Sequence, residues 1–371
     1  MNILFLLTKF ENSGVTTNTI DLCTALSNLG HDVTILVGLN KPQKLTETEK
    51  RHYDRLTKAK VCIKRFNPKH QLYYRLYAFI RIILYILLKK FDIIHIESPQ
   101  LSFIPYFLKK KFTTTFHTGD LLPNFYHKKC THLIAISTEI KKYAIEKFNY
   151  SEKDVSIVFH GVSSHFANDL DEKKIIEIKR QNSIPINKLI IGLVGTIEFR
   201  KGHDILLNAV SKLNKDLQEK IHIVFVGDIN YGNSHSNWIE NIVNETELTN
   251  KVTFIKYCNP IEIYHTFDIF CLPSRLEGFP LVVLEAMLSR NCVIRSNCEG
   301  AYDQINSGIT GYIFENENIS ELAEILNYLI SNPEKIKEIA TKGFNRAINE
   351  FTSDIMAINT VRIYNKIINE Y

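Results

Sequence analysis

The sequence predicts an α/β protein built from two Rossmann-like halves in tandem. Short apolar runs typical of buried parallel strands alternate with helical segments, and this series begins twice, at Asn2–Leu7 and at Leu189–Gly195. A polar, charged stretch at 163–187 separates the two series. The length of 371 residues suits two domains of ordinary size. We therefore predict domains at 1–168 and 169–352, followed by a final helical segment at 353–371.

The composition is that of a globular protein. Hydrophobic residues make up 45% of the chain and there are only 10 prolines, which excludes a disordered chain. No stretch of 18 residues lacks a charge, and the first residues lack the pattern of a signal peptide. The seven cysteines form no CxxC pair and several lie in apolar strand patterns, so we expect them to be reduced core residues in a cytoplasmic protein. No zinc spacing, Asp-x-Asp metal motif or nucleic-acid motif is visible, so we expect neither a metal nor a nucleic-acid partner.

The positive charge is concentrated in one region. Residues 41–90 contain 14 Lys and Arg against 3 Asp and Glu, whereas the rest of the chain contains 31 against 37. This asymmetry predicts an anionic surface as partner. Within the region, the helix expected at 70–90 contains a long apolar run that Arg75 and Arg81 interrupt. It could lie in a membrane interface, or it could be a buried crossover helix leading to the strand at 92–96. The basic residues before it favour peripheral contact with anionic lipid: Lys58, Lys60, Lys64, Arg65 and Lys69.

The first half opens as a Rossmann-like unit. A strand at 2–7, a polar loop containing Gly14, a helix that ends at Gly30 and a strand at 33–37 follow one another. A single glycine such as Gly14 suits either a plain turn or a close approach to phosphate. The strand at 112–116 ends at His117, and ligands of α/β proteins bind at this end of parallel strands. A structural histidine would give the same pattern. Further strands are expected at 131–137 and 155–159.

The second half repeats the pattern. The strand at 189–195 leads into a loop with Arg200 and Lys201, whose charges could neutralise a diphosphate and stabilise it as a leaving group. Lys201 alone could equally be a solvated lysine before a helix. Further strands are expected at 221–226 and 252–255, with a helix at 238–243 between them. The last helix, at 354–368, has apolar residues at steps of three and four.

The most informative stretch is 268–300, a strand, loop, helix and strand that carry two glutamates. Pro280 suits the start of the helix, where free N–H groups and the positive end of the dipole favour an anion. A diphosphate could therefore bind near Leu281 and Val282. Glu285 could then accept hydrogen bonds from ribose, while Glu277 in the loop faces the group carried on the diphosphate. The alternative is that both glutamates are surface residues beside a core helix.

The run from Glu277 to Glu285, Glu-Gly-Phe-Pro-Leu-Val-Val-Leu-Glu, resembles the E-x7-E motif of retaining, nucleotide-sugar-dependent glycosyltransferases of group 4. The flanking Ser-Arg-Leu before Glu277 and Ala-Met after Glu285 strengthen the resemblance. It implies the GT-B fold, in which two Rossmann-like domains face a cleft. It also implies an N-terminal acceptor domain, a C-terminal donor domain and a last helix that crosses back to the N-terminal domain.

The resemblance also implies roles for single residues. His117, Arg200, Lys201 and Glu277 would form the catalytic group, with His117 beside the donor sugar. Donor binding would fall to a second set: Gly14, Gly195, Phe279, Pro280, Leu281, Val282 and Glu285. Two positions depart from the family pattern, since Thr196 replaces the expected arginine and His160 replaces the usual asparagine. Arg200 could supply the missing positive charge from a neighbouring position.

The function expected from the resemblance is retaining, metal-independent sugar transfer from a UDP- or GDP-sugar, without a cofactor. The acceptor would be a glycan or a lipid-linked glycan of a surface polysaccharide. The protein would be cytoplasmic or peripheral on the inner face of the membrane. Two alternatives remain open at this point: a sugar-nucleotide epimerase of similar architecture, and a catalytically silent partner subunit.

Overall fold

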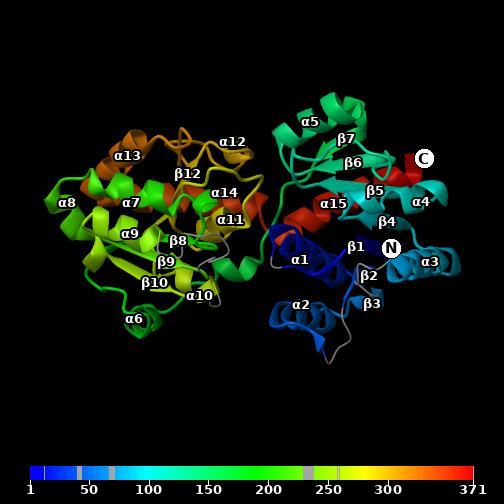
Figure 1. Cartoon of the computed structure of the whole chain (residues 1–371), viewed down its shortest axis with the longest axis horizontal. Helices are drawn as coiled ribbons and strands as arrows, with labels where there is room; N and C mark the ends of the chain where they lie inside the picture. Colours follow the sequence, from blue (N-terminus) through cyan, green and yellow to red (C-terminus); the bar gives the residue numbers. More distant parts are fainter. Residues whose placement is uncertain are drawn as a thin grey trace. The chain divides into compact units, whose positions relative to one another are not determined.

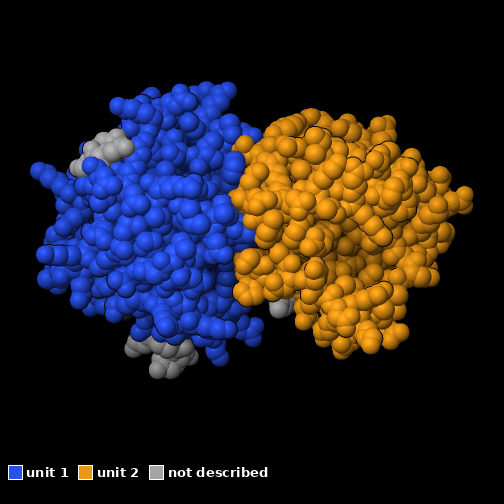
Figure 2. Space-filling model, turned by 180° about the vertical axis from the view of Figure 1, so that it is seen from behind, with its two compact units in different colours: residues 1–162, 352–371 blue, residues 163–351 orange. Residues whose placement is uncertain are grey.

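The computed structural model describes the whole chain apart from residues 12, 40–43, 67–71, 229–237, 257, 259 and 371. The described residues form two compact units, residues 1–162 with 352–371 and residues 163–351 (Figure 2). Each unit contains one parallel sheet with helices packed on it (Figure 1). The α/β class and the two Rossmann-like halves predicted from the sequence are confirmed.

Unit 1 contains a seven-stranded parallel sheet in the order β3-β2-β1-β4-β5-β6-β7. The strands are β1 (Asn2–Leu7), β2 (Asp32–Gly38), β3 (Cys62–Phe66), β4 (Ile93–Ile96), β5 (Phe112–Phe116), β6 (His132–Ala135) and β7 (Val155–Ile157). The helices are α1 (Gly14–Asn28), α2 (Glu47–Lys58), α3 (Leu72–Leu88), α4 (Phe103–Phe107), α5 (Thr138–Phe148) and α15 (Ser353–Glu370). Strand order reverses between β1 and β4, so ligands of this unit are expected at the carboxyl ends of these strands.

Unit 2 contains a six-stranded parallel sheet in the order β10-β9-β8-β11-β12-β13. The strands are β8 (Leu189–Val194), β9 (Ile221–Val226), β10 (Val252–Ile255), β11 (Ile269–Leu272), β12 (Cys292–Ser296) and β13 (Tyr312–Phe314). The helices are α6 (Glu172–Gln181), α7 (His203–Ser211), α8 (Lys215–Lys220), α9 (Trp238–Glu245), α10 (Pro260–Tyr264), α11 (Leu281–Leu288), α12 (Ala301–Gln304), α13 (Ile319–Ser331) and α14 (Pro333–Glu350). Its reversal point lies between β8 and β11.

The C-terminal helix belongs to unit 1. α15 packs against α1, and its buried residues Met356, Ala357, Tyr364 and Ile367 join the core of that unit. Residues 1–162 and 352–371 therefore share one hydrophobic core although 189 residues separate them in the chain. This confirms the return of the last helix to the N-terminal half.

The units divide at 162/163, six residues before the boundary that the sequence suggested. Residues 163–168 belong with unit 2 because Phe166 packs edge-on against Tyr264, with ring centroids 5.8 Å apart, and its carbonyl accepts a hydrogen bond from Ser289 Oγ at 3.2 Å. The second division, at 351/352, lies one residue before the suggested one. Thr352 belongs to unit 1, where it pairs with Val162.

The α3 helix is the crossover helix that one interpretation of its sequence predicted, but it is buried on one side only. It connects β3 to β4, and Ala78, Ile82 and Ile86 are buried at a spacing of four residues. Apolar side chains on its other side are exposed to solvent. His70 and Gln71, which the sequence assigned to the same helix, lie outside the described residues.

All seven cysteines are free, and four of them are buried: Cys23, Cys130, Cys271 and Cys292. Cys62 is exposed because it begins β3, the edge strand of the sheet. The expected core position is therefore wrong for Cys62.

Two fully buried histidines should make the fold sensitive to acid. Burial lowers the pKa of His95 to about 4, and the Glu97 charge opposes this only in part. Burial and the Lys201 charge lower the pKa of His203 to about 3. Both pKa values lie below the value of about 6.5 in the unfolded chain. The two buried, uncharged rings therefore contribute their full stability above pH 6.5, and this contribution is lost as the pH falls toward 4. At pH 4.5 we expect a loss of about 2–3 kcal/mol for each histidine.

Urea unfolding at pH 7.5 and at pH 4.5 measures this loss. His203→Leu should reduce the acid-induced drop in the unfolding midpoint of unit 2, since the leucine cannot take up a proton. An equal drop in the wild-type protein and the variant would count against His203 as the source.

Candidate functional site

The candidate site in unit 2 lies at the reversal point of its sheet. β8 and β11 are adjacent and parallel, and their carboxyl ends lead into the loops at 195–202 and 273–280. The chain leaves β8 and β11 toward opposite sides of the sheet, so the two loops lie next to each other at the carboxyl ends of these strands. The loops bring together residues that lie about 75 positions apart in the sequence.

Arg275 fastens the two loops to each other. Its guanidinium donates to both carboxylate oxygens of Asp204, at 2.9 and 2.7 Å, and to the carbonyl of Phe199 at 2.6 Å. It also stacks 3.6 Å above the Phe199 ring, and its backbone N–H donates to the carbonyl of Arg200 at 2.8 Å. A bidentate Arg–carboxylate pair has a fixed geometry. The loop that carries Glu277 is therefore held rigidly against the loop that carries Lys201.

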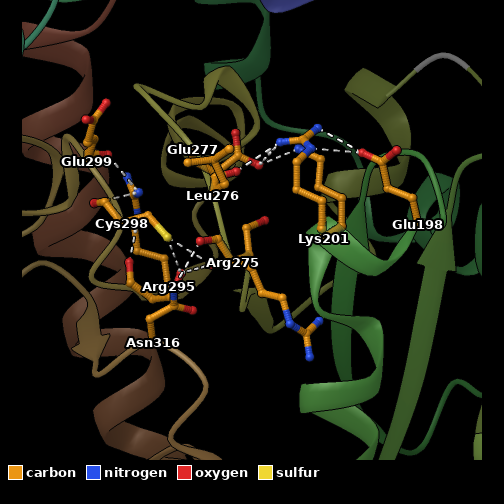
Figure 3. Close-up of polar contacts among 12 residues, drawn as sticks. Glu198, Lys201, Arg275, Leu276, Glu277, Arg295, Cys298, Glu299 and Asn316 are labelled. Carbon is orange, nitrogen blue, oxygen red and sulfur yellow. Dashed lines mark hydrogen bonds and ion pairs between the residues drawn. The ribbon is translucent and has the colours of Figure 1, made fainter. Parts of the chain in front are cut away.

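Three predicted site residues meet at this junction. Lys201 Nζ lies 2.6 Å from Glu277 Oε1 (Figure 3). Arg200 Nη1 lies 3.2 Å from the same oxygen. Arg200 also donates to the Leu276 carbonyl at 3.0 Å and contacts Glu198 Oε1 at 2.9 Å. The side chains of Lys201 and Glu277 are only 12% and 10% exposed. The two cations and the two carboxylates make a compact, electrically balanced cluster.

Glu277 is ionised in this cluster. Burial acts to raise the pKa of Glu277, but the charge and hydrogen bond of Lys201, and then the charge of Arg200, outweigh it. The net pKa of this carboxyl lies below its usual value. Lys201 and Arg200 are thus pre-positioned cations, and an anionic ligand would compete with Glu277 for them.

Two glycines allow the loop at 195–202 to take its path. Gly195 has φ +152°, and a Cβ there would lie 3.4 Å from Cε of Lys201. Gly202 has φ +72°, and a Cβ there would lie 2.0 Å from the carbonyl oxygen of Pro273. Any larger residue at Gly202 would force this loop away from β11. Thr196, where an arginine was expected, is exposed.

The start of α11 lies beside this cluster. Pro280 immediately precedes the helix, and its carbonyl accepts a hydrogen bond from Gln304 Nε2 at 3.1 Å. Gln304 in turn accepts a hydrogen bond from the buried guanidinium of Arg295. Arg295 also donates to the carbonyls of Cys298 and Glu299 (Figure 3). These bonds hold the start of α11 in place, where the first backbone N–H groups have no partner within the helix.

The other residues of unit 2 that were predicted to bind the donor lie in α11 or directly before it. Phe279 is buried and packs edge-on against Phe351, with ring centroids 6.0 Å apart; Leu281 is buried and Val282 is half-buried. Glu285 is half-buried one turn into the helix, and its Oε2 accepts a hydrogen bond from the Tyr264 hydroxyl at 2.8 Å. This hydrogen bond ties Glu285 to Tyr264, the last residue of α10.

His117 belongs to a buried cluster in unit 1. It follows β5, and its Nε2 lies 2.7 Å from Glu97 Oε2, while its Nδ1 lies 3.1 Å from His160 Nε2. Glu97 follows β4, at the reversal point of the unit 1 sheet. Sequence reasoning missed Glu97 and assigned His160 no role. A glutamate directly after a buried strand and before Ser-Pro is the one local signal that could have identified Glu97.

Gly14 is the first residue of α1. A Cβ there would meet nothing within 4 Å, so no packing within unit 1 requires a glycine at this position. Space for a close approach therefore exists, but the structure gives no further evidence for phosphate binding at Gly14. In the described part of the chain, no group of three or more His, Cys, Asp or Glu residues is arranged to hold a metal ion.

Comparisons with known proteins agree with this architecture. Residues 174–346 match the family model "Glycosyl transferases group 1", and residues 12–166 match "Glycosyltransferase Family 4". The capsular polysaccharide biosynthesis glycosyltransferase CapM of Staphylococcus aureus is 27% identical over 244 residues, which are 65% of this chain and 63% of CapM. The chain spans about half to 63% of the length of the first curated relatives that it matches.

Solved structures share the fold over the whole chain. A glycosyltransferase from Rickettsia africae ESF-5 is 23% identical, with a TM-score of 0.86 over 100% of this chain and 99% of that one. HepE of Anabaena, solved in complex with UDP-glucose, is 17% identical, with a TM-score of 0.82 over 99% and 100% of the two chains. At these identities the likeness shows the fold alone, which is GT-B.

Proposed function

Because the chain belongs to the group 1, family 4 glycosyltransferases, we propose that it transfers a sugar from a nucleoside-diphosphate sugar to a glycan or lipid-linked glycan, with retention of configuration. The observation that carries this proposal is the Lys201–Arg200–Glu277 cluster at the reversal point of unit 2. Unit 2 would bind the donor and unit 1 the acceptor. A lipid-linked acceptor would place the enzyme at the inner face of a membrane.

The cluster suits a leaving group that gains negative charge. As the bond between sugar and diphosphate breaks, Lys201 and Arg200 would stabilise the developing charge without reorganisation, because both side chains already point at one carboxylate. The diphosphate would replace Glu277 as the partner of the two cations. Glu277 would then accept hydrogen bonds from the hydroxyls of the transferred sugar. Arg200 reaches this position despite the absence of an arginine at Thr196.

The start of α11 would hold the diphosphate from the other side. The first-turn N–H groups near Leu281 and Val282 would donate to phosphate oxygens, assisted by the helix dipole. Glu285 would accept hydrogen bonds from the ribose, in competition with its present donor, the Tyr264 hydroxyl. Gly195 would let the phosphates approach the backbone.

His117 would approach the donor sugar from unit 1. Both of its ring nitrogens already have partners inside that unit, Glu97 and His160. A sugar hydroxyl would therefore bond to His117 Nδ1 by displacing His160, while the contact with Glu97 remains.

Glu285→Ala should weaken nucleotide binding at least about tenfold, the cost of about 1.4 kcal/mol for a lost hydrogen-bonding pair. Calorimetric titration with UDP and with GDP measures this effect and identifies the base. UDP is the first nucleotide to test, since HepE is solved with UDP-glucose. Glu324→Ala, which removes an exposed glutamate from α13, is the matched control and should bind like the wild type.

The same titration separates the alternatives. If a folded sample binds neither nucleotide, the donor site is not functional and the partner-subunit interpretation replaces this one. If one nucleotide binds, release of nucleoside diphosphate from its sugar derivatives in the presence of acceptor identifies a transferase. Isomerisation of the donor without such release identifies an epimerase.

A further inference from the structure

The outer face of α3 is apolar and uncovered by any described residue of unit 1. Leu76, Ile80, Leu84 and Leu88 recur at intervals of four residues and are all exposed, Leu88 by 78%. Leu87 and Tyr77 widen the same face. A soluble helix normally turns polar residues outward, so this face indicates a contact that the isolated chain does not supply.

The apolar surface continues onto the neighbouring segments. Phe79 of α3 stacks on Phe103 of α4, with ring centroids 5.5 Å apart, and Phe103 meets Tyr126 edge-on, also at 5.5 Å. Several large side chains of α4 and of the segment that includes 121–128 are exposed: Tyr106, Phe107, Leu122, Phe125 and Tyr126. Figure 1 shows α3 and α4 beside each other in unit 1. The α3 face and these five residues form one surface, the apolar surface of unit 1.

Lysines border this surface. Lys89, Lys109, Lys110 and Lys111 line a pocket of about 230 Å³ between the end of α3 and the start of β5, together with Ile86, Phe91, Asp92 and Ile94. The single carboxylate of this pocket, Asp92, already accepts a hydrogen bond from the Asn2 backbone at 2.7 Å. On the other border, Lys128 Nζ lies 4.2 Å from the centroid of the Phe125 ring. The border therefore offers positive charge to an outside partner.

We propose that the apolar surface of unit 1 and its lysine border dock the protein on an anionic lipid bilayer, with the lysine-lined pocket receiving a phosphate headgroup. Leucines and aromatic rings beside lysines suit an interface, where apolar side chains enter the acyl boundary and ammonium groups contact headgroups. No helix among the described residues has the length and hydropathy to cross a bilayer. Because Ala78, Ile82 and Ile86 face the core of unit 1 and the opposite side of α3 is exposed, α3 would lie in the plane of the membrane surface.

This inference deepens the proposed function, since it names the surface through which a lipid-linked acceptor would be reached. The surface overlaps the basic region that the sequence suggested, since α3 and Lys89 lie within 41–90, but it does not use the lysines named there. Lys58 ends α2, Lys60 follows it and Lys64 lies in β3, whereas Lys69 lies outside the described residues. The pocket lysines 109–111 lie beyond the 41–90 region altogether.

Flotation of the full-length protein with vesicles tests the proposal. The wild type should float with vesicles of phosphatidylglycerol and phosphatidylcholine, but not with phosphatidylcholine alone. The double variants Leu88→Glu/Phe107→Glu and Lys109→Glu/Lys110→Glu should each reduce the bound fraction at least about tenfold. Lys215→Glu/Lys220→Glu, on the exposed side of α8, is the matched control and should bind like the wild type. Thermal unfolding of each variant shows that it is folded.

The other outcomes overturn the proposal. Unchanged flotation in both surface variants excludes this surface, and loss only in Lys58→Glu/Lys60→Glu/Lys64→Glu moves the contact to the region near β3. The wild type could instead fail to float with vesicles and form dimers in light scattering. If Leu88→Glu/Phe107→Glu abolishes those dimers, the surface binds a second copy of the chain. Vesicle binding needs no sugar donor, so failure here and failure of the proposed transfer reaction are distinguishable.

Discussion

Replacing Lys201 with glutamine is expected to reduce the rate of sugar transfer by about 100- to 1000-fold, the usual cost of removing one pre-positioned charge stabiliser from an active site. Lys201 Nζ lies 2.6 Å from Glu277 Oε1, and its side chain is only 12% exposed. In this setting its charge is little screened by water. Arg200 would remain, but it is 43% exposed and shares its guanidinium with Glu198 and the Leu276 carbonyl.

The measurement is release of nucleoside diphosphate under saturating donor, with the donor that the wild type accepts. The loss should fall mainly on kcat, because the charge on the leaving diphosphate grows in the transition state. Lys215→Gln, on an exposed helix of the same unit, controls for a general loss of charge and should leave the rate unchanged. A Lys201→Gln enzyme with wild-type kcat would remove Lys201 from the catalytic group.

Replacing Glu97 with glutamine is expected to lower kcat by about 10- to 100-fold, because Glu97 would position His117 in the proposed reaction and a misplaced group typically costs this much. Glu97 is buried and accepts from His117 Nε2 at 2.7 Å. Burial acts to raise the pKa of Glu97, but His95 and His117 outweigh it and hold the net pKa below its usual value. The ionised carboxylate therefore fixes a proton on His117 Nε2.

An amide at position 97 would lose this control. Glutamine has no charge, and its NH₂ group could face His117 Nε2, so that the ring would change tautomer or turn. Because the proposed donor contacts lie mainly in unit 2, the affinity for nucleotide should stay unchanged while kcat falls. His160→Asn is the companion variant, since its amide can still donate to His117 Nδ1; its kcat should change less than about threefold.

A structural role for Glu97 would give a different result. Glu97→Gln would then unfold at lower temperature, yet the folded fraction would keep the wild-type kcat. The pH dependence adds a second readout. If Glu97 holds the proton on His117, the kcat profile of Glu97→Gln should be displaced along the pH axis, whereas that of His160→Asn should keep its shape.

The sequence alone predicted the two Rossmann-like halves and most strands. Asn2–Leu7 and Ile221–Val226 were placed at their observed bounds, because buried parallel strands are short apolar runs whose pattern is local. The last helix was recognised from apolar residues at steps of three and four, and it extends only two residues beyond the predicted end. The α11 helix begins directly after Pro280, as the sequence suggested, and only Val282 and Glu285 of its eight residues are not buried.

Residues that act together across long separations were harder to find. Lys201 and Glu277 were named from separate motifs, but the Arg275–Asp204 pair that joins their loops was not, since its members lie 71 positions apart. Glu97 and His160 lie 20 and 43 positions from His117. Each of these residues has an unremarkable local pattern, and only the strand order of the sheets brings their side chains within hydrogen-bonding distance.

The α3 helix marks the same division between local and tertiary information. Its sequence is apolar on nearly all sides, which fits a buried crossover helix and an interfacial helix equally well. Periodicity gives the relative directions of side chains, but not which direction faces the protein. Local patterns determined where this chain forms strands and helices and which carboxylates and cations could act. The tertiary structure decided which of those groups meet and which apolar face is exposed, because strand order and helix rotation depend on packing between distant segments.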